Sequence, residues 1–248
     1  MPLDVKTFYF QNTKKTTMKK YRWSLALFCT ISMSFAQAEK DSVRVSNGLY
    51  ISSGFISQSR WDINQKLITA NFPAISNSRS EFTIGYRFIG KKFSSNLETA
   101  TSYFEAVNSG NETLLRSNTT RLNVSYPIIN NPNFTFAVGL NASYAVTRLN
   151  LGRENAVIDL NNITATNDMG RLSLRSNVIL AGPSTSLLVA KDKWYETEVR
   201  IAYEFALTNG RWYSDFVSVQ NSITEKGNGR FLLSFLFPVF SIDHKVPR

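Results

Sequence analysis

Apolar and polar residues alternate along most of the chain from about residue 47 onward. In SEFTIGYRFIG, residues 80–90, one face carries Phe82, Ile84, Tyr86 and Phe88, and the other carries Glu81, Thr83, Gly85 and Arg87. A period of two is typical of β-strands whose two faces meet different surroundings. The pattern therefore predicts an all-β protein.

Alternation of this kind recurs in eight segments. The predicted strands lie at residues 49–58, 80–90, 93–104, 120–128, 133–147, 172–180, 196–207 and 231–240. The connections at residues 90–92, 130–133 and 190–193 are short, whereas those after the first strand and at 105–117, 148–170 and 208–229 are long. Tight turns at one end and long loops at the other are typical of an antiparallel up-and-down β-barrel that spans a membrane.

Two places leave the strand count open between eight and ten. Gly182-Pro183 is either a bulge inside a long sixth strand or a turn, because proline cannot donate a hydrogen bond to a strand ladder. Residues 212–223 could form a further strand. We prefer eight strands.

The composition of the polar face indicates which face is outside. The lysines after residue 38 are Lys40, Lys66, Lys91, Lys92, Lys191, Lys193, Lys226 and Lys245, and none lies in a predicted strand. The polar face consists instead of small and uncharged residues with a few Glu and Arg, which suits a narrow lumen. We predict that the apolar face contacts lipid. A soluble secreted barrel that binds an apolar ligand inside is the alternative.

The segment before the strands has the parts of a secretory signal peptide. Lys19, Lys20 and Arg22 precede an apolar run that ends in Ala36-Gln37-Ala38. We predict a signal peptide at residues 18–38 with cleavage near Ala38, after an extension at residues 1–17 that results from a start assigned too far upstream. The mature chain is predicted to have a lead-in at 39–46, a barrel at 47–241 and a tail at 242–248.

Charge and cysteine content narrow the classes of partner. The formal net charge is +10, and residues 1–38 hold six basic residues and one acid, so the mature chain would carry +5. This mild excess predicts no nucleic-acid partner. The single cysteine, Cys29, lies in the predicted signal peptide, so we expect no disulfide in the mature chain.

Glutamate and arginine recur on the predicted inner face. The candidate lumen residues are five acids and six bases: Glu81, Arg87, Glu98, Arg121, Arg171, Arg175, Glu196, Glu198, Arg200, Glu204 and Arg230. Isolated charges in a narrow lumen are costly, so this near balance predicts ion pairs across it. Arg171 and Arg175 are the predicted partners of the acids at 196–204. The network would fill and fix the barrel; in the alternative, an exchange of partners would open a narrow gated path for ions or small solutes.

Residues suited to catalysis or metal binding are sparse. His244 is the only histidine, and in the predicted tail it cannot join a serine–histidine group at the lumen or the loop rim. We predict no catalytic residue and no enzyme, with a lipid-modifying barrel as the exception. A calcium site around Asp159 or Asp168 lacks acids at ligand spacing, and no metal or cofactor is predicted.

Two long connections carry aromatic residues. Trp61 lies in WDINQKLITANFPAI, residues 61–75, and Trp212 and Tyr213 lie in GRWYSDFVSVQ, residues 210–220. We predict these three residues as exposed contacts for an extracellular protein, a glycan or lipopolysaccharide. Packing of the loops against themselves is the alternative.

The signal peptide that ends in AQA, the alternating strands and loop lengths, and the last strand RFLLSFLFPVF resemble the small outer-membrane β-barrel proteins of Gram-negative bacteria, in the size class of the OmpA transmembrane domain and OmpX. The resemblance implies an outer-membrane location, contact with outer-membrane lipids and lipopolysaccharide, and recognition of a terminal aromatic residue, here Phe240, by the barrel assembly machinery. Residues 241–248 extend beyond that position, which departs from the family pattern. We therefore predict a non-enzymatic outer-membrane barrel with a charged, plugged lumen that serves envelope structure or surface interaction.

Overall fold

A computed structural model describes residues 44–90, 92–131, 133–153, 171–189, 196–215, 223–225 and 229–245. The chain divides into Val43–Val246, to which all of these residues belong, and a second unit of Met1–Ser42 with Pro247–Arg248, which lies outside them. The predicted signal peptide at residues 18–38 and the extension at residues 1–17 therefore also lie outside the described residues.

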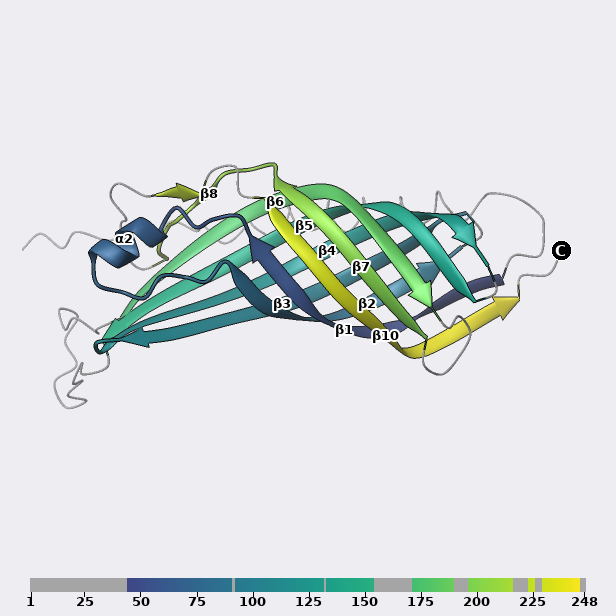
Figure 1. The fold of residues 1–248 in the computed structure, drawn as a ribbon, viewed down its shortest axis with the longest axis horizontal. Coiled ribbons are helices and arrows are strands. Elements are labelled where there is room, and N and C mark those ends of the chain that lie inside the picture. Colours follow the sequence, from purple (N-terminus) through teal and green to yellow (C-terminus); the bar gives the residue numbers. More distant parts are fainter. Residues whose placement is uncertain are drawn as a thin grey trace, which may run out of the picture. The chain divides into compact units, whose positions relative to one another are not determined.

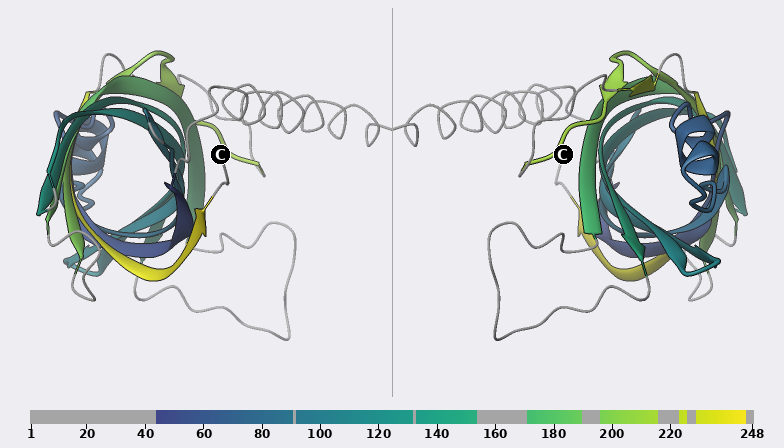
Figure 2. Two further views of the ribbon diagram at one scale, coloured as in Figure 1. Left: turned by 90° about the vertical axis from the view of Figure 1, so that its right-hand side faces the viewer. Right: turned by 90° about the vertical axis from the view of Figure 1, so that its left-hand side faces the viewer.

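Eight long strands form a closed barrel. They are β1 (Arg44–Gln58), β2 (Ser78–Ile89), β3 (Ser94–Asn108), β4 (Asn111–Asn130), β5 (Phe134–Arg153), β6 (Arg171–Val189), β7 (Thr197–Ala206) and β10 (Arg230–Lys245). Each strand pairs antiparallel with its neighbour, and β1 closes the ring by pairing with β10 (Figure 1, Figure 2). The prediction of an eight-stranded antiparallel up-and-down barrel is confirmed.

The remaining elements lie in the connections at one end of the barrel, which we call the long-loop end. The helix α2 (Asn64–Thr69) follows β1, and after β7 the short strand β8 (Gly210–Arg211) pairs with β9 (Thr224–Glu225). The described part of residues 212–223 contains no barrel strand. No helix in the described ranges is long and apolar enough to cross a membrane.

Gly182 and Pro183 lie inside β6 and not at a turn. On one side they pair with β5, whereas on the other side the pairing with β7 is interrupted between Ala181 and Ser184. A β-carbon at position 182 would lie 1.9 Å from the carbonyl oxygen of Tyr203. Glycine permits this close backbone approach, and the interrupted pairing accommodates a proline that has no N–H to donate.

The prediction of a long loop at residues 105–117 is wrong, because β3 and β4 continue through this segment. They meet at a two-residue turn, Ser109-Gly110, whose φ angles are 50° and 77°. Positive φ at both central positions is what the tightest hairpin turns require. Sequence alternation did not reveal the extension, because outward side chains beyond the apolar band of a membrane barrel need not be apolar.

The two faces of the barrel differ in the way that the alternation predicts. The inner face carries many charged and polar side chains, such as Glu98 at 3 % exposure and Arg121 at 2 %, whereas outward side chains include Leu140 at 68 % and Phe55 at 58 %. An extensive apolar outer face is unfavourable in water and suits the hydrocarbon of a membrane. The alternative of a soluble barrel with an apolar interior is therefore wrong.

The last strand is longer than the predicted segment 231–240. β10 continues to Lys245, and the backbone of His244 pairs with Val45 of β1. Residues assigned to the lead-in and the tail thus take part in the closure of the barrel. Lys245, which was predicted to lie outside the strands, is the last residue of β10. The side chain of His244 is outside the described residues.

Four neighbouring strands extend further toward the long-loop end than the others. β3, β4, β5 and β6 have 15, 20, 20 and 19 residues, whereas β2 and β7 have 12 and 10. β1 and β10 have 15 and 16 residues, but their additional pairs, such as Arg44 with Lys245, lie at the short-turn end. In Figure 1 these four strands reach toward the level of α2 and β8, where β1, β2, β7 and β10 have already ended. We call the projecting part, residues 103–116, 148–153 and 171–175, the tall wall.

Candidate functional site in the lumen and at its outer end

Strand register brings the charged inward residues together. Glu98 on β3 lies opposite Arg121 on β4, and Glu204 on β7 lies opposite Arg230 on β10. Alternation turns all four side chains inward, and none of the four residues is more than 4 % exposed. Acids and bases that are distant in the sequence therefore share one buried region.

Arg121 contacts three carboxylates at once. Its Nη2 lies 3.0 Å from Glu81 Oε1, its Nη1 lies 2.9 Å from Glu98 Oε2, and its Nε lies 3.4 Å from Glu204 Oε1. Glu81 and Glu98 come from β2 and β3, whereas Glu204 comes from β7 across the lumen. A planar guanidinium can serve several carboxylates because its donors point in different directions and its charge is permanent. Arg121 therefore connects two sides of the barrel.

Arg200 makes a second connection across the lumen. Its guanidinium forms an ion pair with Glu98 of β3, and its Nη2 lies 3.1 Å from Glu198 Oε1 on its own strand. Glu198 also pairs with Arg87 of β2, whose Nη1 lies 3.7 Å from Glu196 Oε1. The ion pairs therefore form a continuous chain from Glu196, at the short-turn end, to the centre of the lumen.

Arg230 extends the chain toward the long-loop end. Its Nε lies 2.5 Å from Glu204 Oε2, and Ser143 Oγ donates a hydrogen bond of 2.7 Å to Glu204 Oε1. Glu204 is 0 % exposed, and a buried carboxylate is costly unless cations and hydrogen bonds replace water. Arg121, Arg230 and Ser143 supply both.

The residues joined in this way are Glu81, Arg87, Glu98, Arg121, Glu196, Glu198, Arg200, Glu204 and Arg230. Arg175 is not among them, and its predicted position in the lumen is wrong: Leu174 and Ser176 on either side of it are buried inside, so Arg175 points outward. Leu174 faces inward because loop residues pack against it there. The side chain of Arg171 lies outside the described residues.

Arg79 is a lumen residue that the sequence analysis missed. β2 begins at Ser78, two residues before the predicted strand, and Arg79 shares the inward face with Glu81 at 6 % exposure. The alternation, extended back by one residue, would have revealed it. Arg79 Nη1 donates to the carbonyl oxygen of Ser76 at 3.5 Å, and its guanidinium carbon lies 4.9 Å from the ring centroid of Trp61. No carboxylate of the described residues forms an ion pair with Arg79.

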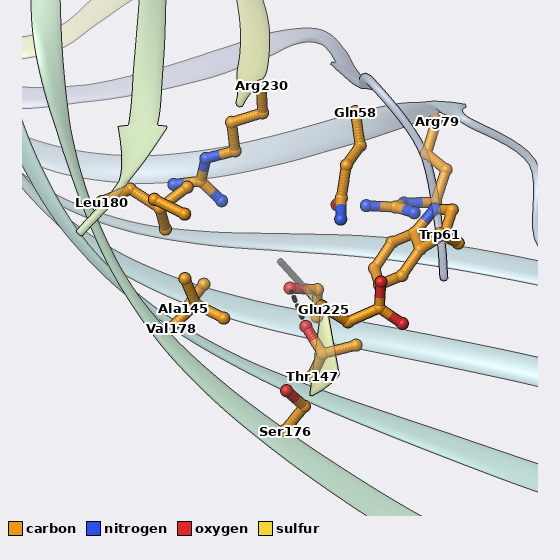
Figure 3. Close-up of a pocket in the computed structure, with 12 residues that line it drawn as sticks. Gln58, Trp61, Arg79, Ala145, Thr147, Ser176, Val178, Leu180, Glu225 and Arg230 are labelled. Carbon is orange, nitrogen blue, oxygen red and sulfur yellow. Dashed lines mark hydrogen bonds between the residues drawn. The ribbon is translucent and has the colours of Figure 1, made fainter. Parts of the chain in front are cut away.

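A cavity of about 40 Å³ lies between the ion pairs and the loops. Figure 3 shows the side chains of Arg79, Arg230 and Gln58 on one side, and those of Thr147 and Ser176 on another. The cavity therefore adjoins both the charged lumen and its outer end.

Glu225 of β9 closes the cavity on the loop side and was also missed by the sequence analysis. Its Oε1 accepts hydrogen bonds from the backbone N–H of Ile63 at 3.1 Å and from Trp212 Nε1 at 2.8 Å, and its Oε2 accepts one from the backbone N–H of Asp62 at 2.6 Å. A buried carboxylate with several N–H donors is well satisfied. Glu225 thus joins the two long connections, which no alternation pattern could indicate.

Loop residues pack against the inner face of the tall wall. This cap cluster comprises Leu115, Leu149, Leu151 and Leu174 of the strands together with Trp61, Ile63, Leu67, Ile75 and Trp212 of the connections. The ring centroids of Trp61 and Trp212 are 6.4 Å apart. The apolar inner face of the tall wall is thereby covered.

The prediction that Trp61 and Trp212 are exposed contact residues is wrong. They are 7 % and 1 % exposed, because they fill the cap cluster. Tyr213 is half-buried: Asn177 Nδ2 donates to its hydroxyl at 2.9 Å, and its backbone pairs with Arg175 along the edge of β6. These residues fit the alternative interpretation, in which the loops pack against themselves.

Three arginines lie opposite one another on the outer face of the tall wall. Arg116 of β4 is opposite Arg148 of β5, which is opposite Arg175 of β6. Tyr103 of β3 continues the row at one end, and Tyr213 continues it at the other. We call these five residues the arginine row. None of its arginines forms an ion pair with another described residue.

Among the residues that the structure describes, no group of three His, Cys, Asp or Glu side chains is placed to hold a metal ion. Asp159 and Asp168, which we considered as the centre of a calcium site, lie outside the described ranges.

No protein-family model and no curated protein sequence matches the chain. Among solved structures, the neisserial surface protein A (NspA) is similar at 10 % identity over 79 % of this chain and 97 % of that chain, with a TM-score of 0.42. The attachment invasion locus protein Ail of Yersinia pestis is similar at 10 % identity over 80 % of this chain and 100 % of that chain, with a TM-score of 0.37. The closed ring of eight strands is the fold of a small outer-membrane β-barrel protein.

The outer-membrane protease OmpT of Escherichia coli is also similar, at 11 % identity over 81 % of this chain and 96 % of that chain, with a TM-score of 0.29. This match contradicts the prediction that the chain is not an enzyme. The class of barrel and the shortage of histidine are not sufficient grounds for that exclusion.

Proposed function

We propose that the chain is an envelope barrel of the Gram-negative outer membrane whose outer rim binds the phosphate groups of lipopolysaccharide, while ion pairs close its lumen. The observation that carries the proposal is the arginine row on the tall wall. Lipid binding of this kind combines the two roles predicted from the sequence, envelope structure and surface interaction.

The chemistry of the arginine row favours an anionic partner. Like charges directly opposite on neighbouring strands repel each other, and here Arg148 has an arginine on both sides. A phosphate between two guanidinium groups turns that repulsion into attraction, and arginine binds phosphate through paired hydrogen bonds. Two phosphates would suffice to bridge Arg116, Arg148 and Arg175.

The position of the row also fits lipopolysaccharide. On the short-turn side of the row, the outward residues of β5 and β6 include Tyr144 and Ile179, each 45 % exposed, which would contact acyl chains. Tyr103 and Tyr213 flank the arginines, and tyrosine is enriched where the hydrocarbon of a membrane meets the polar headgroups. The arginines would thus lie at the level of the lipid phosphates.

Delivery to the outer membrane follows from the sequence predictions. Cleavage of the signal peptide at residues 18–38 near Ala38 would release the mature chain, with a lead-in at 39–46, a barrel at 47–241 and a tail at 242–248. The barrel assembly machinery would then recognise the aromatic last strand around Phe240. Partner proteins or glycans outside the cell would meet the loops above the tall wall.

Binding of lipopolysaccharide is tested by purifying the barrel in mild detergent and measuring how much lipopolysaccharide remains bound per protein. We expect the double variant R116Q/R148Q to retain several-fold less than wild type. The matched control is R60Q/R211Q, which removes the same charge from two exposed loop arginines and should retain as much as wild type. Equal retention by both double variants and wild type would contradict the proposal.

A further inference from the structure

We infer that the cavity at the long-loop end of the lumen is a binding site for a small inorganic anion, such as phosphate or chloride, held between the guanidinium groups of Arg79 and Arg230. The site is distinct from the arginine row on the outer face. It also does not depend on whether the lumen conducts.

Four polar atoms of residues that line the cavity are buried and have no hydrogen-bond partner within the described ranges. They are Trp61 Nε1, Arg79 Nε, Ser176 Oγ and Arg230 Nη2, and their residues are 7 %, 6 %, 3 % and 4 % exposed. An unpaired buried polar group is destabilising, and native proteins contain few of them. All four atoms can donate, so their concentration around one cavity calls for an acceptor inside it.

Both guanidinium groups can bind a further acceptor. Arg230 uses Nε for Glu204 and Nη1 for Thr119 Oγ1 at 3.4 Å, which leaves Nη2. Among the residues that the structure describes, Arg79 makes a single hydrogen bond, the long one to the carbonyl oxygen of Ser76. Figure 3 shows both groups along one side of the cavity, with the amide of Gln58 between them. Two cations that border one small cavity favour a negative charge inside it.

The carboxylates near this space are occupied by other donors. Glu204 is held by Arg121, Arg230 and Ser143. Glu225 lines the cavity, but both of its oxygens accept hydrogen bonds from backbone N–H groups and the indole of Trp212. Glu81, which shares the inward face of β2 with Arg79, is held by Arg121. None of these three carboxylates forms an ion pair with Arg79, so its guanidinium has no counter-ion within the described residues, and a bound anion would supply one.

The size and lining of the cavity select the class of ligand. A volume of about 40 Å³ exceeds what a single water molecule needs but is too small for a lipid headgroup, a sugar or a peptide. Ala145, Val178 and Leu180 form an apolar part of the lining, and apolar surroundings strengthen the attraction between an anion and the guanidinium groups. A small inorganic anion satisfies the charge, the donors and the space.

The test is calorimetric titration of the folded barrel in detergent with sodium phosphate and, separately, sodium chloride. Sodium gluconate holds the ionic strength constant, because its anion is too large for the cavity. We expect saturable binding of at least one anion by wild type and at least tenfold weaker binding by Arg79→Gln. Trp61→Phe keeps an aromatic ring but removes the N–H, and it should weaken binding several-fold. Arg211→Gln, an exposed loop variant, should bind like wild type.

Two results would overturn the inference. One is the lack of saturable binding by wild type up to about 100 mM of either anion, well above the range of weak specific affinities; the donors would then bind water only. The other is wild-type affinity in both Arg79→Gln and Trp61→Phe. If Arg79→Gln does not fold, Trp61→Phe decides alone, because it alters one donor and leaves every charge in place.

Discussion

At the scale of single residues, the buried charges of the lumen depend most on Arg121. It is 2 % exposed, and its guanidinium contacts carboxylates of Glu81, Glu98 and Glu204 from three strands. Each of these acids is itself at most 5 % exposed. Removal of this one cation would leave the three carboxylates close together in a region from which water is largely excluded.

We expect Arg121→Met to destabilise the barrel by about 3–5 kcal/mol, the range for removal of one partner from a buried ion pair. The measurement is the urea midpoint of unfolding in detergent or lipid vesicles, followed by tryptophan fluorescence. Arg211→Met, which alters an exposed arginine, should change the free energy of unfolding by less than about 0.5 kcal/mol. An unchanged midpoint for Arg121→Met would show that the ion pairs contribute little to stability.

The alternation of apolar and polar residues was sufficient to identify lumen residues only where it was regular along a strand. It assigned Glu198, Arg200 and Glu204 to the inner face, where the structure places them. It failed for Arg175, because apolar residues of the tall wall face inward toward the cap cluster and thereby invert the usual rule for a membrane barrel. Alternation also gives the face of a side chain but not its partner across the lumen, which depends on closure of the ring.

At the scale of elements, the long connections fold into a cap that the barrel strands do not require for their own pairing. Trp212 is central to this cap: it is 1 % exposed, packs near Trp61 and donates its indole N–H to Glu225. Loss of a buried tryptophan removes a large packed surface. The cap should therefore loosen before the barrel does.

Limited trypsin digestion can follow this loosening at Lys66 in α2. We expect Trp212→Ala to increase the rate of cleavage after Lys66 at least tenfold, while the heat-dependent gel mobility of the barrel stays that of wild type. Ile68→Ala is the control, because Ile68 is on the same helix but 64 % exposed. Equal cleavage rates in Trp212→Ala and wild type would show that the cap is held by other contacts.

Strand number could be predicted from the sequence, whereas strand length could not. Alternation identifies a strand where one face must be apolar, as in residues 134–147 of β5. Above the apolar band the outward face can carry residues such as Arg116 and Arg148, so the pattern no longer distinguishes strand from loop. The turn at Ser109-Gly110 and the parts of the tall wall at residues 105–116 and 148–153 were missed for this reason.

At the scale of the whole molecule, the ion pairs cross the lumen in more than one place. Arg200 of β7 reaches Glu98 of β3, and Arg121 of β4 reaches Glu204 of β7. We expect purified wild-type protein in planar bilayers to give no reproducible conductance steps, because ions would have to displace these pairs. Reproducible steps that change in Arg200→Ala, but not in Arg211→Ala, would favour the gated path instead.

The unequal strand heights also give the barrel a direction within the plane of the membrane. At about 3.3 Å per residue and a tilt of about 40°, the 20 residues of β4 rise about 50 Å, roughly twice the apolar band of such barrels. The projecting side carries the arginine row, whereas β1 and β10 on the opposite side expose phenylalanines such as Phe55 and Phe237. Lipopolysaccharide would gather along one arc of the circumference and leave the other arc to neighbouring proteins. Different sides of the barrel would therefore contact different molecules in the membrane.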